Sequence, residues 1–351
     1  MTLVTRYDTV EIVRSALDPI EDLTSWIAGL RSADYVSDIL SGIHGIAPKS
    51  AVRRAASLAA HFSSTALGLL EQAFSGPAEL SFLPLYYAVL NLSKIYIVLA
   101  GRSSELATNR KHGASYDPSR KTSHHLLTEQ LTIWPKGVFP LFYSVLTDGH
   151  ALRHARTISL GSVYPYIHGI SHEYHLAYRH LPMLQLMSIH LEGDSATGWR
   201  LHARILQPRG PEAENLRNLR AVSGFRRMPG STVDFVSVSV RAPGEATALD
   251  QLHRKVRRFL LYETALNPTL QPTASITPIS SRHLMLPEEM PIWLAFNHLS
   301  SIVRYNPEVL KRIEDSKAWP MLLAMRKHCT LRFLLLFWSN LHQTEYRISA
   351  E

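Results

Sequence analysis

The histidines are concentrated in one part of the sequence, where ten of 18 fall between His112 and His190. Three of them follow the spacing i, i+4, i+7: His168, His172 and His175. On a helix this spacing places the rings on one face, where three imidazoles can bind zinc and leave a position open for water. Pro165 and Gly169 weaken the helix that this site requires. We therefore predict packed or exposed histidines, with no metal site and no cofactor.

A second pattern pairs an arginine with a histidine in a polar, basic segment. Arg120 and His125 are separated by four residues. A histidine can act as general acid or base on a ribose 2′-hydroxyl or a leaving oxygen, while an arginine stabilises phosphate charge. This spacing resembles the signature of HEPN-type ribonucleases, helical bundles that dimerise so that two copies of the motif meet. The alternative interpretation is a solvated basic loop.

Basic side chains form two further groups. One lies in a region predicted to be β and includes Arg226 and Arg227. The other lies on the outer face of a helix predicted over 249–261: Arg254, Lys255, Arg257 and Arg258. Such faces bind phosphate backbones, and Trp199 and Phe225 are aromatic neighbours that can stack on bases. The alternatives are an acidic protein, an anionic membrane surface or a solvated face.

The composition restricts the class of protein. The chain has 351 residues, of which 46% are hydrophobic and 19% charged, with a net charge of +8. These values exclude intrinsic disorder and a collagen-like repeat, and the single cysteine, Cys329, excludes a disulfide scaffold. A glycine-rich phosphate loop, a G-x-S-x-G elbow and an H-E-x-x-H motif are all absent from the sequence. We expect Cys329 to be a buried structural thiol.

The apolar pattern predicts the elements that position these residues. Helical spacing predicts helices over 51–74, 82–99, 292–305 and 319–341. The period changes in the middle, where alternation predicts strands over 199–206 and 232–241. The predicted fold is mainly α, a helical bundle with a small inserted antiparallel β element, distantly HEPN-like. The predicted regions are 1–190, helical; 191–245, the β-containing insertion; and 246–351, helical and packed on the first.

Two apolar segments are long or hydrophobic enough to be considered as membrane-spanning helices. Residues 80–100 are interrupted by Pro84, Asn91 and Lys94, and 331–338 is far shorter than the roughly 20 residues of a spanning helix. Both are predicted to be buried helices. The first residues have no apolar core or cleavage site of a signal peptide, so we expect a soluble, cytoplasmic protein.

Three stretches together resemble the YaaC-like family of bacterial proteins. The first spans 85–94 and combines paired tyrosines with Asn91 and Lys94; the second joins His112-Gly113 to 136–140; the third spans 299–307. The likeness covers 50–150 and 290–340, and the middle β region is not placed by it. No reaction is established for the family. The resemblance implies that the protein is a subunit of a bacterial antiviral defence system.

The residues in these stretches predict a polar network or a ligand pocket. Asn91 and Lys94 lie in an otherwise apolar helix and must find partners, because unpaired buried polar groups are costly. His112, Arg304 and Tyr305 are the expected partners. The leading hypothesis is an accessory protein that binds nucleic acid or a protein partner through basic faces, in a homo-oligomer or a heteromeric complex. The alternative is a metal-independent, HEPN-like ribonuclease with Arg120 and His125 as the acting pair.

Overall fold

The architecture comes from a computed structural model of the whole chain. It describes residues 2–3, 9–15, 18–42, 49–109, 111–116, 126–147, 149, 151–179, 185–205, 226–256, 260–262, 274–276 and 286–350. The chain divides into two units, each assembled from segments that are distant in the sequence. The helical unit comprises Leu17–His180 and Glu289–His342, and the β unit comprises Met1–Ala16, Leu181–Glu288 and Gln343–Glu351.

The helical unit contains eleven of the described α-helices. They are α1 (Pro19–Ala28), α2 (Ala33–Gly42), α3 (Lys49–Ser75), α4 (Phe82–Leu99), α5 (Ser103–Thr108), α6 (Val138–Leu146), α7 (Ser171–Tyr178), α10 (Glu289–Tyr305), α11 (Pro307–Glu314), α12 (Trp319–Ala324) and α13 (Thr330–His342). A π-helical turn, Met325–Cys329, connects α12 to α13 and contains the buried thiol of Cys329. The helices predicted over 51–74, 82–99, 292–305 and 319–341 are therefore confirmed.

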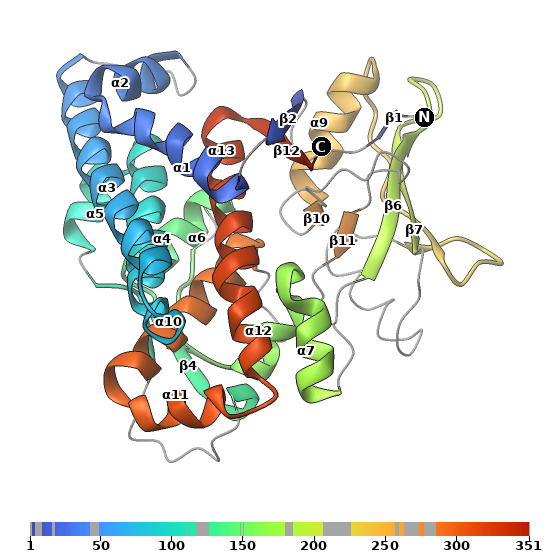
Figure 1. Cartoon of the computed structure of the whole chain (residues 1–351). Coiled ribbons are helices and arrows are strands. Elements are labelled where there is room, and N and C mark those ends of the chain that lie inside the picture. Colours follow the sequence, from blue (N-terminus) through green and yellow to red (C-terminus); the bar gives the residue numbers. More distant parts are fainter. Residues whose placement is uncertain are drawn as a thin grey trace. The chain divides into compact units, whose positions relative to one another are not determined.

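Helix α4 lies at the centre of this unit. It packs along α3, as Figure 1 shows, and also against α10. Small alanines on one face of α3, such as Ala56, Ala59 and Ala66, are buried and allow close approach. Because α4 contacts helices on several sides, nearly all of its side chains are buried, including Tyr86. This explains the apolar character that α4 has all round.

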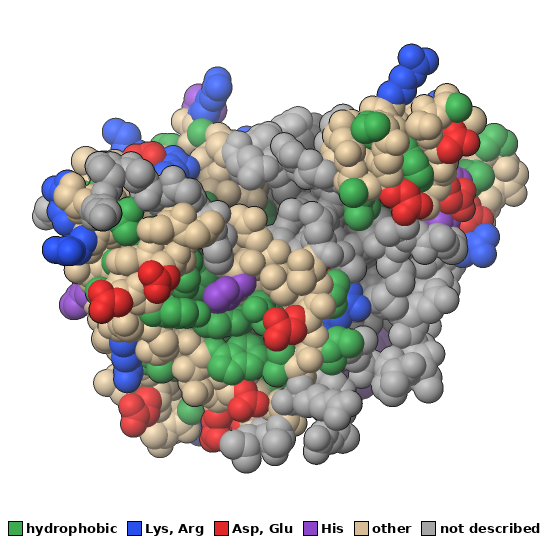
Figure 2. Space-filling view, turned by 90° about the horizontal axis from the view of Figure 1, so that it is seen from above, with side chains coloured by type: hydrophobic (Ala, Val, Ile, Leu, Met, Phe, Trp, Pro, Cys, Tyr) green, Lys and Arg blue, Asp and Glu red, His purple; other side chains and the backbone are tan. Residues whose placement is uncertain are grey.

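One apolar segment of the described chain, Ala78–Leu99, is long enough to cross a membrane, and 72% of the apolar 18-residue window within it is buried in the protein. Such burial is typical of the core helix of a soluble protein. Figure 2 shows one face of the molecule, where hydrophobic side chains gather in a patch over the helical unit. Acidic side chains lie around this patch, and Lys and Arg side chains lie farther out toward the edge of the face.

A small antiparallel sheet completes the helical unit. Its order is β3 (Ala114–Tyr116), β4 (Gln130–Ile133) and β5 (Arg156–Ser159). Glu129 directly precedes β4, and its carboxyl group is hydrogen-bonded with the Nε2 atom of His298 in α10. Both side chains are almost fully buried, and the Tyr164 hydroxyl lies 3.5 Å from the other ring nitrogen of His298. This buried pair links the sheet to the central helices.

The β unit is built on a seven-stranded sheet. Its order is β10-β11-β6-β7-β9-β8, and β1 pairs with β6. The strands are β1 (Thr2–Leu3), β6 (Gln185–Glu192), β7 (Arg200–Ile205), β8 (Arg226–Arg227), β9 (Asp234–Val236), β10 (Leu260–Tyr262) and β11 (Ala274–Ile276). The β unit also contains helix α9 (Glu245–Val256) and a separate parallel pair of strands, β2 (Thr9–Ser15) and β12 (Thr344–Ala350). The mainly α chain with a small antiparallel β element is confirmed.

Two details of the predicted β region are wrong. The strand predicted over 232–241 is limited to β9 and one bridge from Trp199 to Val240. Its buried side chains are Phe235 and Ser237, whereas Val238 is exposed. Ser237 is buried because its hydroxyl accepts a hydrogen bond from the Leu201 amide at 2.9 Å. Trp199 is buried and donates to the Ala242 carbonyl at 3.2 Å, so its ring is not a surface for bases.

Candidate anion-binding site

A row of polar side chains on one side of α4 forms the first part of the candidate site. Tyr87, Asn91 and Lys94 are spaced by four and three residues, which places them on one side of the helix. The Asn91 amide donates to the Tyr87 carbonyl at 2.7 Å, and the Lys94 ammonium group donates to the Asn91 side-chain oxygen at 3.4 Å. The Lys94 Nζ atom also lies 5.1 Å from the centre of the Phe62 ring on α3. Asn91 thus orients Lys94.

His112 is held beside α4 by two closely packed glycines. Gly113 and Gly137 have φ values of +89° and +129°, which L side chains rarely adopt. A Cβ atom on Gly137 would lie 2.5 Å from the Gly113 Cα atom. The Phe139 amide donates to the His112 carbonyl at 2.9 Å. The His112 imidazole is therefore held against two aromatic rings. Its centre lies 5.5 Å from the centre of the Tyr86 ring and 5.8 Å from that of the Tyr87 ring.

Arg304 approaches the same tyrosine from the last turn of α10. Its Nη1 atom donates to the Tyr87 hydroxyl at 3.2 Å. The guanidinium carbon lies 5.9 Å from the centre of the Tyr87 ring and 5.0 Å from that of Tyr305. Arg304 is exposed, and Tyr305 is 57% exposed. A basic group and an aromatic ring are therefore available to solvent at this end of α10.

The site carries positive charge without a compensating carboxylate. Burial lowers the pKa of the His112 imidazole, and the charges of Lys94 and Arg304 lower it further. Burial also lowers the pKa of the Lys94 ammonium group. Within the described part of the chain, no acidic side chain forms an ion pair with Lys94 or Arg304. Lys94 and Arg304 therefore have no acidic partner in the described structure, and this favours the binding of an anionic ligand.

Three buried polar atoms lie in the core beside the site: the Tyr86 hydroxyl, the Trp293 indole nitrogen and the side-chain oxygen of Asn297. The Tyr86 hydroxyl has the Asn297 side chain as its polar neighbour, whereas the Trp293 nitrogen has no hydrogen-bond partner in the described structure. The two rings are in edge contact, with centres 5.2 Å apart, and burial raises the pKa of the Tyr86 hydroxyl. An unsatisfied buried donor costs about 1–3 kcal/mol. Tyr86 on α4 and Asn297 on α10 are therefore polar neighbours in the core of the helical unit.

The structure brings together all five residues of the predicted polar network, with one change in how they connect. Asn91 and Lys94 were expected to find their partners in His112 and Arg304. Lys94 instead bonds to Asn91, and Arg304 is linked to α4 through the Tyr87 hydroxyl. His112 contributes ring contacts with Tyr86 and Tyr87.

The other predicted site residues lie elsewhere or outside the description. Arg120, His125, Arg257 and Arg258 fall outside the described residues, as do the side chains of Arg254 and Lys255. Arg226 and Arg227 form β8 and are exposed. His168 belongs to a 3₁₀ turn that ends at Ile170, before α7 begins. The three histidines therefore do not share one helix, and the reason is the break at Gly169 and Ile170.

A hollow elsewhere in the helical unit has a different character. It is lined by residues of α1, α3 and α12, and its lining contains both acidic and basic side chains: Asp18, Glu21, Glu71, Arg31, Arg326 and Lys327. Arg326 is already engaged, because it donates to the carbonyls of Ala73 and Phe74 at the end of α3. Such balanced charge does not select an anion. The Lys94–His112–Arg304 cluster remains the candidate site.

Three residues near the site are not predicted from the sequence: Tyr87, Trp293 and Asn297. Asn297 is a buried polar residue in the otherwise apolar α10, seven residues before Arg304. This is the same signal that selected Asn91 in α4. Tyr87 lies in the paired-tyrosine stretch already singled out, one turn before Asn91. Trp293 gives no polar signal, because an apolar core explains it equally well.

Comparison with known proteins assigns the chain to a family. The family model described as YaaC-like Protein matches residues 30–341, which includes the middle β region as well as both helical segments. No curated protein and no solved structure shows significant similarity to the chain. All three stretches that carry the resemblance contribute residues to the cluster around Tyr87. The chain belongs to the YaaC-like family.

Proposed function

We propose that the protein binds single-stranded nucleic acid, with a phosphate group held between Lys94, His112 and Arg304. The observation that carries this proposal is that Arg304 and His112 both contact Tyr87, with Lys94 farther along the same side of α4, and that neither Lys94 nor Arg304 has an ion-paired carboxylate in the described structure. An arginine guanidinium presents a planar set of donors that matches phosphate oxygens, and a lysine adds a point charge. The half-buried position of Lys94 and His112 strengthens their attraction for an anion.

The aromatic groups favour a single strand over a duplex. Tyr305 is exposed beside Arg304, and the half-buried ring of Tyr87 also contacts the guanidinium group. Unstacked bases bind to aromatic side chains, with about 1–3 kcal/mol per stacked base, whereas bases in a duplex already stack on each other.

Removal of the site cations is expected to weaken oligonucleotide binding. Arg304→Gln and Lys94→Met each eliminate one charge, and hydrogen bonds to charged groups contribute about 1.5–3 kcal/mol, so we expect a loss of about 10- to 150-fold. Each variant also lowers the slope of log K against log salt by about one. Fluorescence anisotropy with a labelled single-stranded RNA over a range of salt concentrations measures both effects.

A matched control is Lys317→Gln, which removes one charge from the same unit at an exposed position with no ion pair in the described structure. Equal weakening by this control and by Arg304→Gln would contradict a defined site, because it would show a response to net charge alone. RNA cleavage in the same assay, abolished by His125→Ala, would instead support the ribonuclease alternative.

Binding is expected to strengthen as the pH falls from about 8 to about 6. In the free protein the pKa of His112 is lowered, so the ring is neutral at neutral pH. A bound phosphate favours the imidazolium ion and raises this pKa, so the complex takes up a proton and its stability increases at lower pH. The same titration with His112→Gln should lose this dependence, whereas His172→Gln, an exposed histidine on α7, should keep it.

A further inference from the structure

We propose that His190, Glu192 and His202 form a binding site for a transition-metal ion, with Zn²⁺ as the best match to the ligand types. The site lies in the β unit and is independent of the cluster around Tyr87. Within the described residues, these three side chains bring their ligand atoms within 4.8 Å of one another.

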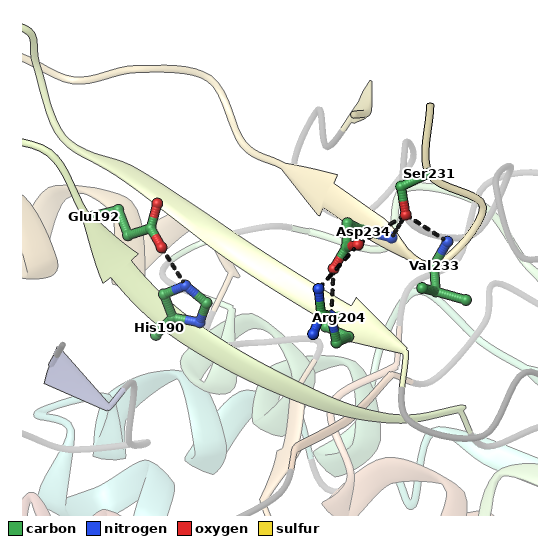
Figure 3. Close-up of polar contacts among 6 residues, drawn as sticks. All are labelled: His190, Glu192, Arg204, Ser231, Val233 and Asp234. Atoms are coloured by element: carbon green, nitrogen blue, oxygen red, sulfur yellow. Dashed lines mark hydrogen bonds and ion pairs between the residues drawn. The ribbon is translucent and has the colours of Figure 1, made fainter. Parts of the chain in front are cut away.

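The sheet itself places the three ligands together. His190 and Glu192 are two residues apart on β6, so their side chains point to the same face. His202 on β7 is paired directly with His190, which places it on that face as well. The opposite face is occupied by Ile189, Leu191, Leu201 and Ala203, all buried. Figure 3 shows His190 and Glu192 projecting from the strand side by side.

The contacts among the three side chains converge on the carboxylate. The Nε2 atom of His190 lies 2.7 Å from one Glu192 oxygen, and that of His202 lies 3.2 Å from the other. The two imidazole rings are nearly parallel, with centres 5.5 Å apart, so both Nε2 atoms face the same carboxylate. The histidine side chains are mostly buried, at 15% and 21% exposure, and Glu192 is 49% exposed.

These distances require little movement to accept an ion. Ligand atoms at zinc–nitrogen and zinc–oxygen distances of about 2.0–2.2 Å in a tetrahedral site are separated by about 3.3 Å. The carboxylate needs to move away from the rings only slightly to admit the ion between them. Two imidazoles and one carboxylate are a known zinc ligand set, and they leave a fourth position for water or an anion.

The neighbouring charges leave the carboxylate available. Arg204, two residues after His202 on β7, forms an ion pair with Asp234 at 2.6 Å, and Ser231 donates to the same carboxylate at 2.8 Å, as Figure 3 shows. Arg200 lies directly across from Glu192 in the sheet register and forms no ion pair with it in the described structure. Glu192 is therefore shared by the two histidines.

The test uses full-length protein without a histidine tag, treated with a chelator and then titrated with ZnCl₂ by calorimetry. We expect one ion per chain at the high-affinity site and an increase of the melting temperature of the protein. His190→Gln/His202→Gln should lose at least tenfold in affinity and the shift in melting temperature. Titration with Co²⁺ provides a spectroscopic check, because Co²⁺ absorbs visible light more strongly in tetrahedral than in octahedral coordination.

His172→Gln is the matched control, because it removes an exposed imidazole from the other unit. Circular dichroism of each variant without metal tests that the strands still form. Glu192→Gln, which keeps the shape of the side chain but lacks its charge, should reduce affinity less than the double histidine variant. Zinc binding that is unchanged in the double variant, or an absence of binding by the wild-type protein, would overturn the proposal and leave a hydrogen-bonded cluster.

Discussion

Replacing His298 with leucine is expected to lower the free energy of unfolding by about 3–5 kcal/mol. The side chain has no exposed surface, and its Nε2 atom forms a short hydrogen bond with the Glu129 carboxyl group, which is itself 2% exposed. Leucine fills most of the volume but removes the hydrogen-bonding partner from a buried polar group. The cost of desolvating Glu129 is then no longer offset by this bond. Urea unfolding followed by circular dichroism and tryptophan fluorescence measures the loss.

A double-mutant cycle separates the bond from simple packing. Glu129→Met removes the carboxyl group, and Glu129→Met/His298→Leu places apolar side chains at both positions. We expect the double variant to be more stable than the sum of the two single losses predicts, by about 1–3 kcal/mol. His172→Leu, on the exposed surface of α7, should change stability by no more than about 0.5 kcal/mol. Additive losses in the cycle would show that the two side chains act independently.

The helical framework was predictable because its signal is local. An apolar run of the length of α4 and the spacing of apolar residues in α3 each specify a buried helix without knowledge of the remainder of the chain. The Glu129–His298 bond is the opposite case, because its two residues are 169 positions apart. No periodicity connects them, and only the packing of the β3-β4-β5 sheet against α10 brings them together.

The β region shows why alternation alone can mislead. The valines at positions 236, 238 and 240 alternate with polar residues and were interpreted as one continuous strand. The regular pairing ends at Val236, and Ser237 is buried because its hydroxyl meets a backbone amide of β7. A polar side chain with a buried hydrogen-bond partner has the same sequence signal as an exposed one. Pattern therefore located the strand but did not determine its length.

The candidate sites were predictable to different degrees. Asn91 and Lys94 stood out as polar residues in an apolar helix, and this signal does not depend on tertiary structure. Their contact with Arg304 through Tyr87 depends on the packing of α4 on α10. His190 and Glu192 carry a local signal, the i, i+2 spacing of one strand face, but their third partner depends on the register of β6 with β7.

Gly137→Ala is expected to be the substitution with the broadest effect, because it disturbs both the fold and the candidate anion site. The backbone at Gly137 has φ +129°, and strain of this kind costs about 1–3 kcal/mol in a residue with a side chain. The new Cβ atom would also meet the Gly113 Cα atom at 2.5 Å and the Lys111 carbonyl at 2.8 Å. Both are backbone atoms, so no flexible side chain can move aside, and overpacking adds about 1–3 kcal/mol. We expect a total loss of about 2–6 kcal/mol in the free energy of unfolding.

Two other glycines separate the backbone strain from the steric clash. Gly149 has φ +93° but no atom within 4 Å of an added Cβ, so Gly149→Ala should cost only the strain, about 1–3 kcal/mol. Gly68 lies within α3, also with open space, and Gly68→Ala should stabilise the helix by up to about 1 kcal/mol. A loss for Gly137→Ala no larger than that for Gly149→Ala would show that the close contact with Gly113 is absent.

The same variant tests whether the glycine pair positions His112. The His112 carbonyl accepts a hydrogen bond from the Phe139 amide at the start of α6, next to Gly137. If an added Cβ atom pushes Gly113 and Gly137 apart, we expect the His112–Gly113 segment to shift relative to the rings of Tyr86 and Tyr87. Folded Gly137→Ala protein should therefore bind single-stranded RNA more weakly and lose the pH dependence that His112 confers, as His112→Gln does. Gly149→Ala should retain both properties. Because the imidazole itself is unchanged in Gly137→Ala, a shared loss with His112→Gln would assign the effect to its position rather than to its presence.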